Sequence, residues 1–83
     1  MYKLLISPKF ANSFEKLPPR IQDAVRRALQ EIKEVPYQGK PLIRELTGRR
    51  SWRVGVYRII YRIKKKDKVV LVIAIDHRSR IYN

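Results

Sequence analysis

Arginines and tyrosines alternate with apolar residues between positions 52 and 63. Gly55 and Val56 form a candidate two-residue hairpin turn within this run, because glycine supplies the positive φ that a type II′ turn requires. The register that follows sets Arg53 directly opposite Arg58. Like charges opposed on a sheet are destabilising unless the side chains reach bulk solvent or hold an anion together. The hairpin therefore predicts a paired arginine site for an anion such as a phosphate.

The same hairpin register assigns the neighbouring side chains to two faces. It pairs Trp52 with Ile59, and the side-chain period of two places Arg62 on the face of Arg58. The alternate residues of this run are expected to face the core, and they are Tyr57, Ile59, Tyr61 and Ile63. A single surface arginine is usually a solvated charge, but a row of arginines within strands favours a binding surface.

A second group of polar residues follows an apolar run at positions 69–75. His77 suits proton transfer at neutral pH, because histidine is the side chain that ordinarily titrates there. A lone histidine is usually structural or merely exposed, and here that interpretation and a role in proton transfer remain equally open. Arg78 could join the paired arginines, and Tyr82 could stack on a base or polarise a phosphate oxygen. A tyrosine so close to the chain end could also be idle.

Composition narrows the class of partner. The 83 residues predict a single domain, 1–83, with a net charge of +13 and a pI near 10.7, which points to a polyanion such as nucleic acid or a ribosome. Residues 49–83 hold eleven Lys/Arg against two Asp/Glu, so the charge is concentrated there. The absence of cysteine excludes disulfides, thiolate nucleophiles and Cys-based zinc sites. We expect no cofactor, no metal, no membrane segment and a cytoplasmic location.

Two helices should position these groups. Residues 2–6 are a candidate strand that stops at Ser7, which can cap a helix, with proline in the first helical turn. The apolar residues of the first helix share one face, and they are Phe10, Phe14 and Leu17. After Pro18 and Pro19, a second helix has the clearest stripe of the chain, at Ile21, Val25, Ala28, Ile32 and Val35.

The remaining chain should form the sheet. Residues 42–46 are a short strand candidate, 47–51 a basic loop, 52–54 and 57–63 the hairpin, and 69–75 a strand that is apolar at every position. Such a strand is expected to be buried on both faces in the middle of the sheet. The prediction is an α+β fold in which an N-terminal strand precedes an antiparallel two-helix hairpin, packed on one face of a small, mostly antiparallel sheet of four to five strands.

The order of these elements resembles the RelE/ParE superfamily of type II toxin–antitoxin toxins. The similarity covers nearly the whole chain, and its most specific parts are the segment from Arg53 to Tyr61 and the closing segment from His77 to Tyr82. The resemblance implies a RelE-like endoribonuclease that cuts mRNA on the ribosome and so inhibits translation. It also implies a cognate acidic antitoxin that wraps the toxin in a hetero-oligomer.

The resemblance further implies roles for individual residues. Arg58 matches the strand arginine that contacts the scissile phosphate, Arg78 the arginine that stabilises charge or protonates the leaving group, and Tyr82 the tyrosine that orients a base. Arg53 falls at the basic position before Val54 and Gly55, where RelE has a lysine implicated in activating the nucleophile. His77 stands where RelE has another lysine, so His77 could take the proton. Five further residues are predicted to contact RNA, and they are Arg49, Arg50, Trp52, Arg62 and Arg80.

The expected reaction is attack of the mRNA 2′-hydroxyl on the adjacent phosphate without a metal. This chain departs from many relatives before the turn, so Arg50 could supply a second cation from a shifted position. Two other functions remain open. ParE toxins share the fold and poison DNA gyrase, and a basic module could bind RNA or the ribosome without cutting.

Overall fold

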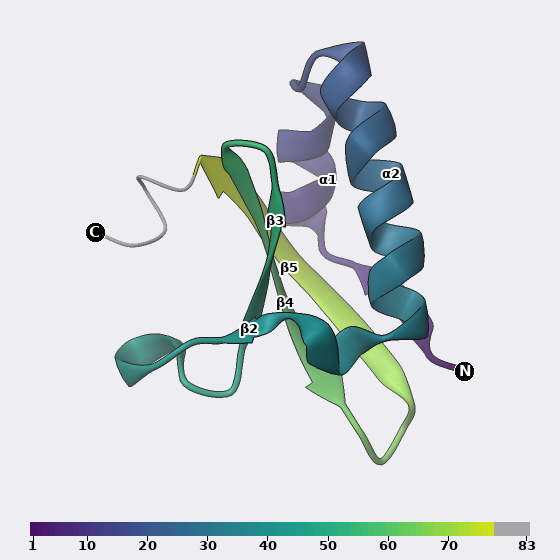
Figure 1. Ribbon diagram of the computed structural model, residues 1–83, viewed down its shortest axis with the longest axis vertical. Coiled ribbons are helices and arrows are strands. Elements are labelled where there is room, and N and C mark those ends of the chain that lie inside the picture. The colour runs from purple at the N-terminus through teal and green to yellow at the C-terminus, as the bar shows by residue number, and fades with distance from the viewer. Residues whose placement is uncertain (78–83) are drawn as a thin grey trace.

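The structure, a computed structural model, describes residues 1–77. Along the chain, a strand precedes two helices, and the remaining strands follow (Figure 1). The helices and strands are β1 (Lys3–Ile6), α1 (Pro8–Glu15), α2 (Pro19–Glu34), β2 (Lys40–Pro41), β3 (Arg50–Val54), β4 (Tyr57–Lys64) and β5 (Val69–His77). Two 3₁₀ turns, Pro36–Gln38 and Arg44–Leu46, flank β2.

The strands form one sheet in the order β1-β5-β4-β3-β2. Only β1 and β5 run parallel, and the other neighbours are antiparallel. The helices lie on the same side of this sheet, with α1 packed on β5 and α2 on β3 (Figure 1). The predicted α+β class, the helical hairpin and the mostly antiparallel sheet are therefore confirmed, and the sheet has five strands within residues 1–77.

The start of α1 is fixed by Ser7, as its sequence predicted. The Ser7 hydroxyl accepts a hydrogen bond from the Phe10 amide at 3.0 Å, which caps the helix. The same hydroxyl donates to the Ile73 carbonyl at 2.6 Å. One side chain thus caps α1 and ties it to β5.

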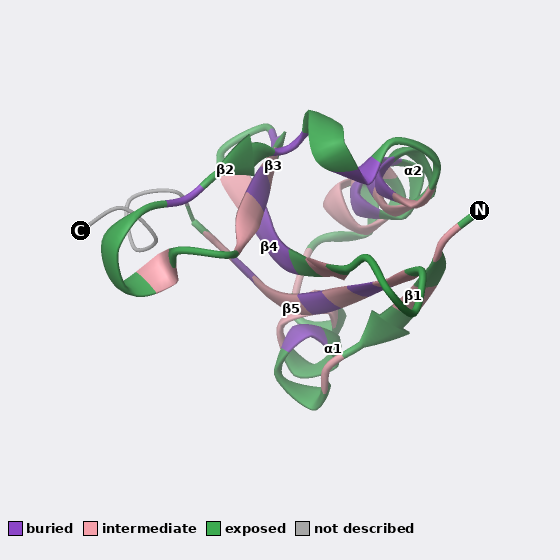
Figure 2. Ribbon diagram, turned by 90° about the horizontal axis from the view of Figure 1, so that it is seen from below, coloured by how far each residue is buried: buried purple, intermediate pink, exposed green. Residues whose placement is uncertain are grey.

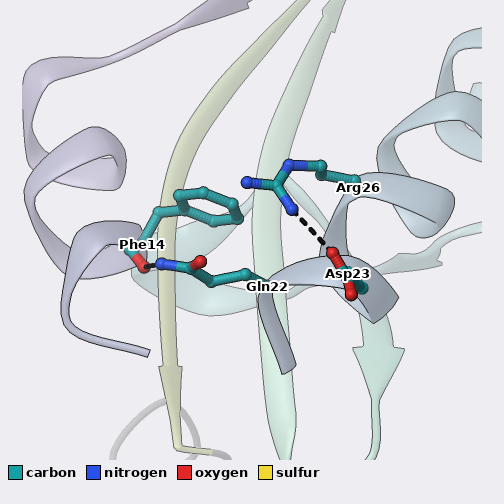
Figure 3. A network of polar contacts seen from close by, with 4 residues as sticks. All are labelled: Phe14, Gln22, Asp23 and Arg26. Carbon is teal, nitrogen blue, oxygen red and sulfur yellow. Dashed lines mark hydrogen bonds and ion pairs between the residues drawn. The ribbon is translucent and has the colours of Figure 1, made fainter. Parts of the chain in front are cut away.

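A polar network joins the two helices on their outer side (Figure 3). The Gln22 side chain donates to the Phe14 carbonyl at 2.9 Å, and the Arg26 guanidinium lies 5.3 Å from the centroid of the Phe14 ring. Asp23 accepts from Arg26 at 2.7 Å. The Gln22 and Arg26 contacts tie α2 to the end of α1, but the exposed ion pair adds little to stability.

The core lies between the helices and the sheet, where Figure 2 shows buried segments on β4, β5 and parts of α1 and α2. Fully buried side chains include Val25 and Ile32 of α2, Ile59 and Tyr61 of β4, and Val72 of β5. The last member of the stripe predicted for α2 is not part of it, because the helix ends at Glu34 and Val35, which caps it, is exposed. Tyr61 is a core residue, as predicted.

The hairpin has the predicted register. Arg53 pairs with Arg58 across β3 and β4, and Trp52 pairs with Ile59. Gly55 adopts a φ of 59°, which a two-residue turn with glycine first requires. Because the alternation of β4 is unbroken, Arg58 and Arg62 face away from the helices.

Strand β5 is an interior strand, as predicted, but only alternate stretches of it are fully buried. Val70, Val72 and Ile75 are buried, whereas the residues between them are half-buried. In the pairing of β4 with β5, Ile60 pairs with Ala74 and Tyr61 pairs with Val72. Ile73 is therefore an extra residue in β5. This bulge keeps the apolar face of β5 on the helix side along its whole length.

The strand predicted at residues 42–46 is wrong. The paired segment is instead Lys40–Pro41, and Arg44–Leu46 forms a 3₁₀ turn. Arg44 has a φ of 60°, and the Thr47 hydroxyl donates to the Arg44 carbonyl at 2.7 Å, so local hydrogen bonds replace strand pairing. The basic loop predicted at 47–51 also ends early, because β3 begins at Arg50.

Candidate functional site

An open groove of about 550 Å³ lies beside the paired arginines, on the side of the sheet away from the helices. The turn at Gly55 brings Arg53 and Arg58 directly opposite each other, as their sequence predicted. Lys40 of the edge strand adds a third cation to the lining. The lining residues are Gln38, Gly39, Lys40, Ser51, Trp52, Arg53 and Arg58. A groove with three cations suits a phosphate.

A carboxylate also faces this arginine pair. Asp76 of β5 pairs with Arg58 across the strands, so Arg58 stands between Arg53 and Asp76. The Asp76 carboxylate accepts the His77 amide at 2.8 Å, which holds the acid at the strand end. The Arg58 guanidinium also donates to the Tyr57 carbonyl at 3.4 Å. The acid offsets part of the repulsion between the two arginines.

His77 ends β5, where it is exposed and pairs with Tyr57. The two rings meet edge to face, with centroids 6.1 Å apart. In the strand alternation His77 therefore belongs to the face of Tyr57 and not to that of Arg58. The other closing residues of the predicted site, Arg78, Arg80 and Tyr82, lie outside the described residues.

Arg50 does not line the groove, although the sequence analysis grouped it with Arg53. Its guanidinium donates to the carbonyls of Tyr37 at 3.1 Å and Gly39 at 2.7 Å, and it lies 5.1 Å from the centroid of the Tyr37 ring. Arg49 is half-buried and lines a different hollow with Arg50. Of the other predicted RNA contacts, Trp52 lines the groove while half-packed on the core, and Arg62 is exposed on β4 beyond the groove.

Tyr61 holds one wall of the groove in place. Its hydroxyl donates to the Pro36 carbonyl at 2.6 Å, and burial raises the pKa of Tyr61 to about 12, although the nearby charge of Arg50 opposes that rise. Gly39 lies against this hydroxyl so closely that a Cβ there would overlap it. The segment from Pro36 to Gly39 is therefore held by hydrogen bonds from both the Tyr61 hydroxyl and the Arg50 guanidinium.

Three residues that no sequence pattern predicted also belong to this region, and they are Lys40, Tyr37 and Asp76. A lysine beside a short edge strand carries no signal of its own. Asp76 could have been found by pairing β4 with β5, but only if the bulge at Ile73 had been anticipated. Within residues 1–77 there is no cluster of three or more His, Asp or Glu side chains that could hold a metal ion. No helix in this part of the chain is long and apolar enough to cross a membrane.

Comparison with known proteins defines the class to which this fold and groove belong. The family model described as ParE toxin of type II toxin–antitoxin system, parDE, matches residues 4–82. Toxin RelG from Mycobacterium tuberculosis is 40% identical over 83 residues, a match that covers 98% of this chain and 95% of RelG. The chain therefore belongs to the RelE/ParE superfamily of type II toxin–antitoxin toxins.

Solved structures agree with this assignment. The crystal structure of the RelBE2 toxin–antitoxin complex from M. tuberculosis contains a chain that is 39% identical, with a TM-score of 0.85 over 93% of this chain and 98% of that one. The archaeal RelE–RelB complex from Pyrococcus horikoshii has a chain that is 24% identical, with a TM-score of 0.79 over 95% of this chain and 97% of that one. At that identity the archaeal likeness supports the fold alone.

Proposed function

We propose that this chain is a RelE-type toxin that cuts mRNA on the ribosome and so inhibits translation. The observation that carries the proposal is the groove in which Arg53 and Arg58 stand in register, with Lys40 beside them. Like charges are brought together at a cost, and a phosphate between them would offset that cost. The 40% identity to Toxin RelG supports the RelE side of the superfamily.

The reaction is attack of the 2′-hydroxyl oxygen on the adjacent phosphorus. The 2′-oxygen loses its proton and forms a bond to phosphorus, and the bond to the 5′-oxygen of the next nucleotide breaks as that oxygen gains a proton. The products are a 2′,3′-cyclic phosphate and a 5′-hydroxyl end. Arg53 and Arg58 would stabilise the extra negative charge of the pentavalent transition state, which is the largest catalytic term in many enzymes.

The resemblance to RelE implies that residues in the closing segment of the chain transfer the protons. Arginine is a poor general base because its pKa exceeds about 12, so His77 is the candidate proton acceptor. Its backbone at the end of β5 lies one residue from the strand position opposite Arg58, but its ring lies on the face of Tyr57, so the family resemblance and not the groove carries this assignment. Arg78 is the candidate that neutralises the leaving group, and Tyr82 the candidate that holds a base.

An acidic antitoxin is the proposed protein partner. The related structures from M. tuberculosis and P. horikoshii are described as complexes of toxin with antitoxin. The net charge of +13 favours an acidic partner that gives rapid, electrostatically guided binding. A hetero-oligomer in the cytoplasm, where ribosomes and mRNA are present, follows from this function.

The test is cleavage of mRNA on programmed ribosomes in the presence of EDTA at a concentration that leaves the ribosomes intact. Primer extension maps new RNA ends for the native chain, Arg58→Ala and the control Arg20→Ala. Arg20 is an exposed arginine of α2 and does not line the groove. Cuts in the A site that carry cyclic phosphate ends, lost in Arg58→Ala and kept in Arg20→Ala, are expected. Cutting that both variants retain would contradict the role of the groove.

Gyrase poisoning is the second candidate, because the family model is described as a ParE toxin. A gyrase poison would stabilise cleaved DNA in a supercoiling assay and leave mRNA on ribosomes intact. A chain that only binds RNA would do neither. The two assays on one preparation therefore separate the three functions.

A further inference from the structure

A second, smaller hollow lies next to the groove and has no part in the proposed chemistry. Its volume is about 220 Å³, several times the roughly 30 Å³ that one water molecule takes in the liquid. It is lined by Tyr37, Pro41, Gly48, Arg49, Arg50 and Ile63. The lining thus combines one aromatic ring, two guanidinium groups and apolar walls.

The Tyr37 ring is available to a ligand and is held in place. Half of the residue is exposed, a large fraction for an aromatic side chain. The Arg50 guanidinium lies over the ring, with its centre 5.1 Å from the ring centroid, and is itself fixed by two backbone carbonyls. A side-chain hydrogen bond to Tyr37 also raises the pKa of Tyr2. A rigid aromatic ring backed by a cation is what a stacking platform requires.

Strand register links the hollow to the groove. On the two-strand ribbon of β2 and β3, Lys40 pairs with Ser51, and both residues line the groove. The next pair is Pro41 with Arg50, and both residues line the hollow. Because successive pairs face opposite sides of a sheet, the groove and the hollow lie on either side of β2. This strand is an edge of the sheet, so an extended polymer can pass over it.

We propose that this hollow binds a nucleobase of single-stranded RNA, next to the nucleotide whose phosphate lies between Arg53 and Arg58. The base stacks on Tyr37, and the guanidinium groups of Arg49 and Arg50 lie beside it. A phosphate alone would not use the ring or the apolar walls of Pro41 and Ile63, whereas every base has an apolar face to stack. The proposal rests on the proposed function in taking RNA as the ligand and the paired arginines as its phosphate site.

The test measures binding and not cleavage. A fluorescent 2′-O-methyl oligonucleotide, which has no free 2′-hydroxyl to react, is titrated with the purified chain and followed by anisotropy. A series of the same oligonucleotide carries one abasic residue at each position in turn. The variants are Tyr37→Leu, which removes the ring, and Tyr37→Phe, which keeps the ring but loses the hydroxyl. Ile43→Ala is the control, because Ile43 is 72% exposed in the neighbouring loop and lines neither cavity.

One abasic position is expected to weaken binding to the native chain about tenfold, in line with the cost of removing one stacked base. Tyr37→Leu should bind the intact oligonucleotide about tenfold more weakly and should no longer respond to that abasic position. Tyr37→Phe and Ile43→Ala should behave like the native chain. Circular dichroism and thermal unfolding check that each variant is folded.

Three results would overturn the proposal. The first is an oligonucleotide affinity that Tyr37→Leu leaves within twofold of the native value, or no binding by any form. The second is an abasic effect that persists unchanged in Tyr37→Leu. The third is a loss of affinity in Tyr37→Phe as large as that in Tyr37→Leu, which would assign the effect to the hydroxyl and not to a stacked ring. If mRNA on ribosomes stays uncut while Tyr37→Leu still abolishes the response to the abasic position, the base site stands and only the proposed reaction fails.

Discussion

Arg50 and Arg53 lie three residues apart on one strand, yet their surroundings differ. Arg50 donates to two backbone carbonyls and covers the Tyr37 ring, so its charge is used to hold a loop. Arg53 is exposed and stands opposite another arginine at the edge of a groove. The difference follows from the strand alternation, since an odd spacing sends the two side chains to opposite faces. Basic residues that are close in sequence can therefore divide between structure and binding.

Removing the groove charge should have the largest effect. We expect Arg58→Ala to lower the rate of mRNA cleavage by about two to three orders of magnitude, which is the usual cost of one well-placed transition-state donor. Stability should change by less than about 0.5 kcal/mol, because the substitution lies outside the core. Single-turnover cleavage and urea unfolding measure the two quantities. A rate loss under threefold would show that Arg58 takes no part in the reaction.

Near Arg50, the buried Tyr61 hydroxyl should make the free energy of unfolding depend on pH. A tyrosine in the unfolded chain loses its proton near pH 10, whereas burial raises the pKa of Tyr61 to about 12 in the folded protein. The raised pKa means that the stabilisation is fully present below pH 10 and is lost as pH rises from 10 to 12. The expected loss is about 2–3 kcal/mol, at about 1.4 kcal/mol per pKa unit.

Urea unfolding of the native chain and of Tyr61→Phe between pH 8 and 12 tests this. Other tyrosines and the lysines also titrate in this range, so the difference between the two proteins is the informative quantity. That difference should shrink as pH rises above 10, because phenylalanine has no proton to lose. If the free energies of unfolding of the two proteins changed with pH in parallel, folding would not raise the pKa of Tyr61.

A pair of substitutions should separate the two arginines directly. Arg50→Ala should lower the free energy of unfolding by about 1–2 kcal/mol, because two hydrogen bonds from a charged donor are lost. For a domain of this size that corresponds to a decrease in Tm of roughly 4–16 °C. Arg53→Ala should leave Tm nearly unchanged and reduce cleavage instead. Equal Tm values for both variants would remove the structural distinction between them.

The groove was predictable from sequence because a local turn determines it. Glycine at position 55 sets the register of β3 and β4, and that register alone places Arg53 opposite Arg58. The helices were predictable for a similar reason, since Ser7 and the prolines mark where they begin. The part of the fold that depends on interactions between residues close in sequence could therefore be predicted from the sequence.

The rest depended on contacts between distant segments. The positive φ of Arg44 broke the strand expected at 42–46, and no apolar pattern encodes that angle. The structural role of Arg50 comes from the carbonyls of residues 37 and 39, which belong to a loop that is also held by the Tyr61 hydroxyl. The position of Asp76 opposite Arg58 requires the bulge at Ile73. Each of these features is set by tertiary structure and not by local propensity.

The smallest expected effect concerns Asp76, which places a negative charge beside the groove arginines. Asp76→Asn keeps an oxygen that can accept the His77 amide but removes the charge. Two like unit charges about 4 Å apart repel by about 1 kcal/mol in water, and the repulsion falls with distance, so the variant should bind a 2′-O-methyl oligonucleotide up to about threefold more tightly. Because the Debye length falls from about 30 Å at 0.01 M salt to about 3 Å at 1 M, the gain should disappear at high salt. Anisotropy titrations across that range measure it, and weaker binding by Asp76→Asn at low salt would mean instead that the acid orients Arg58 for the phosphate.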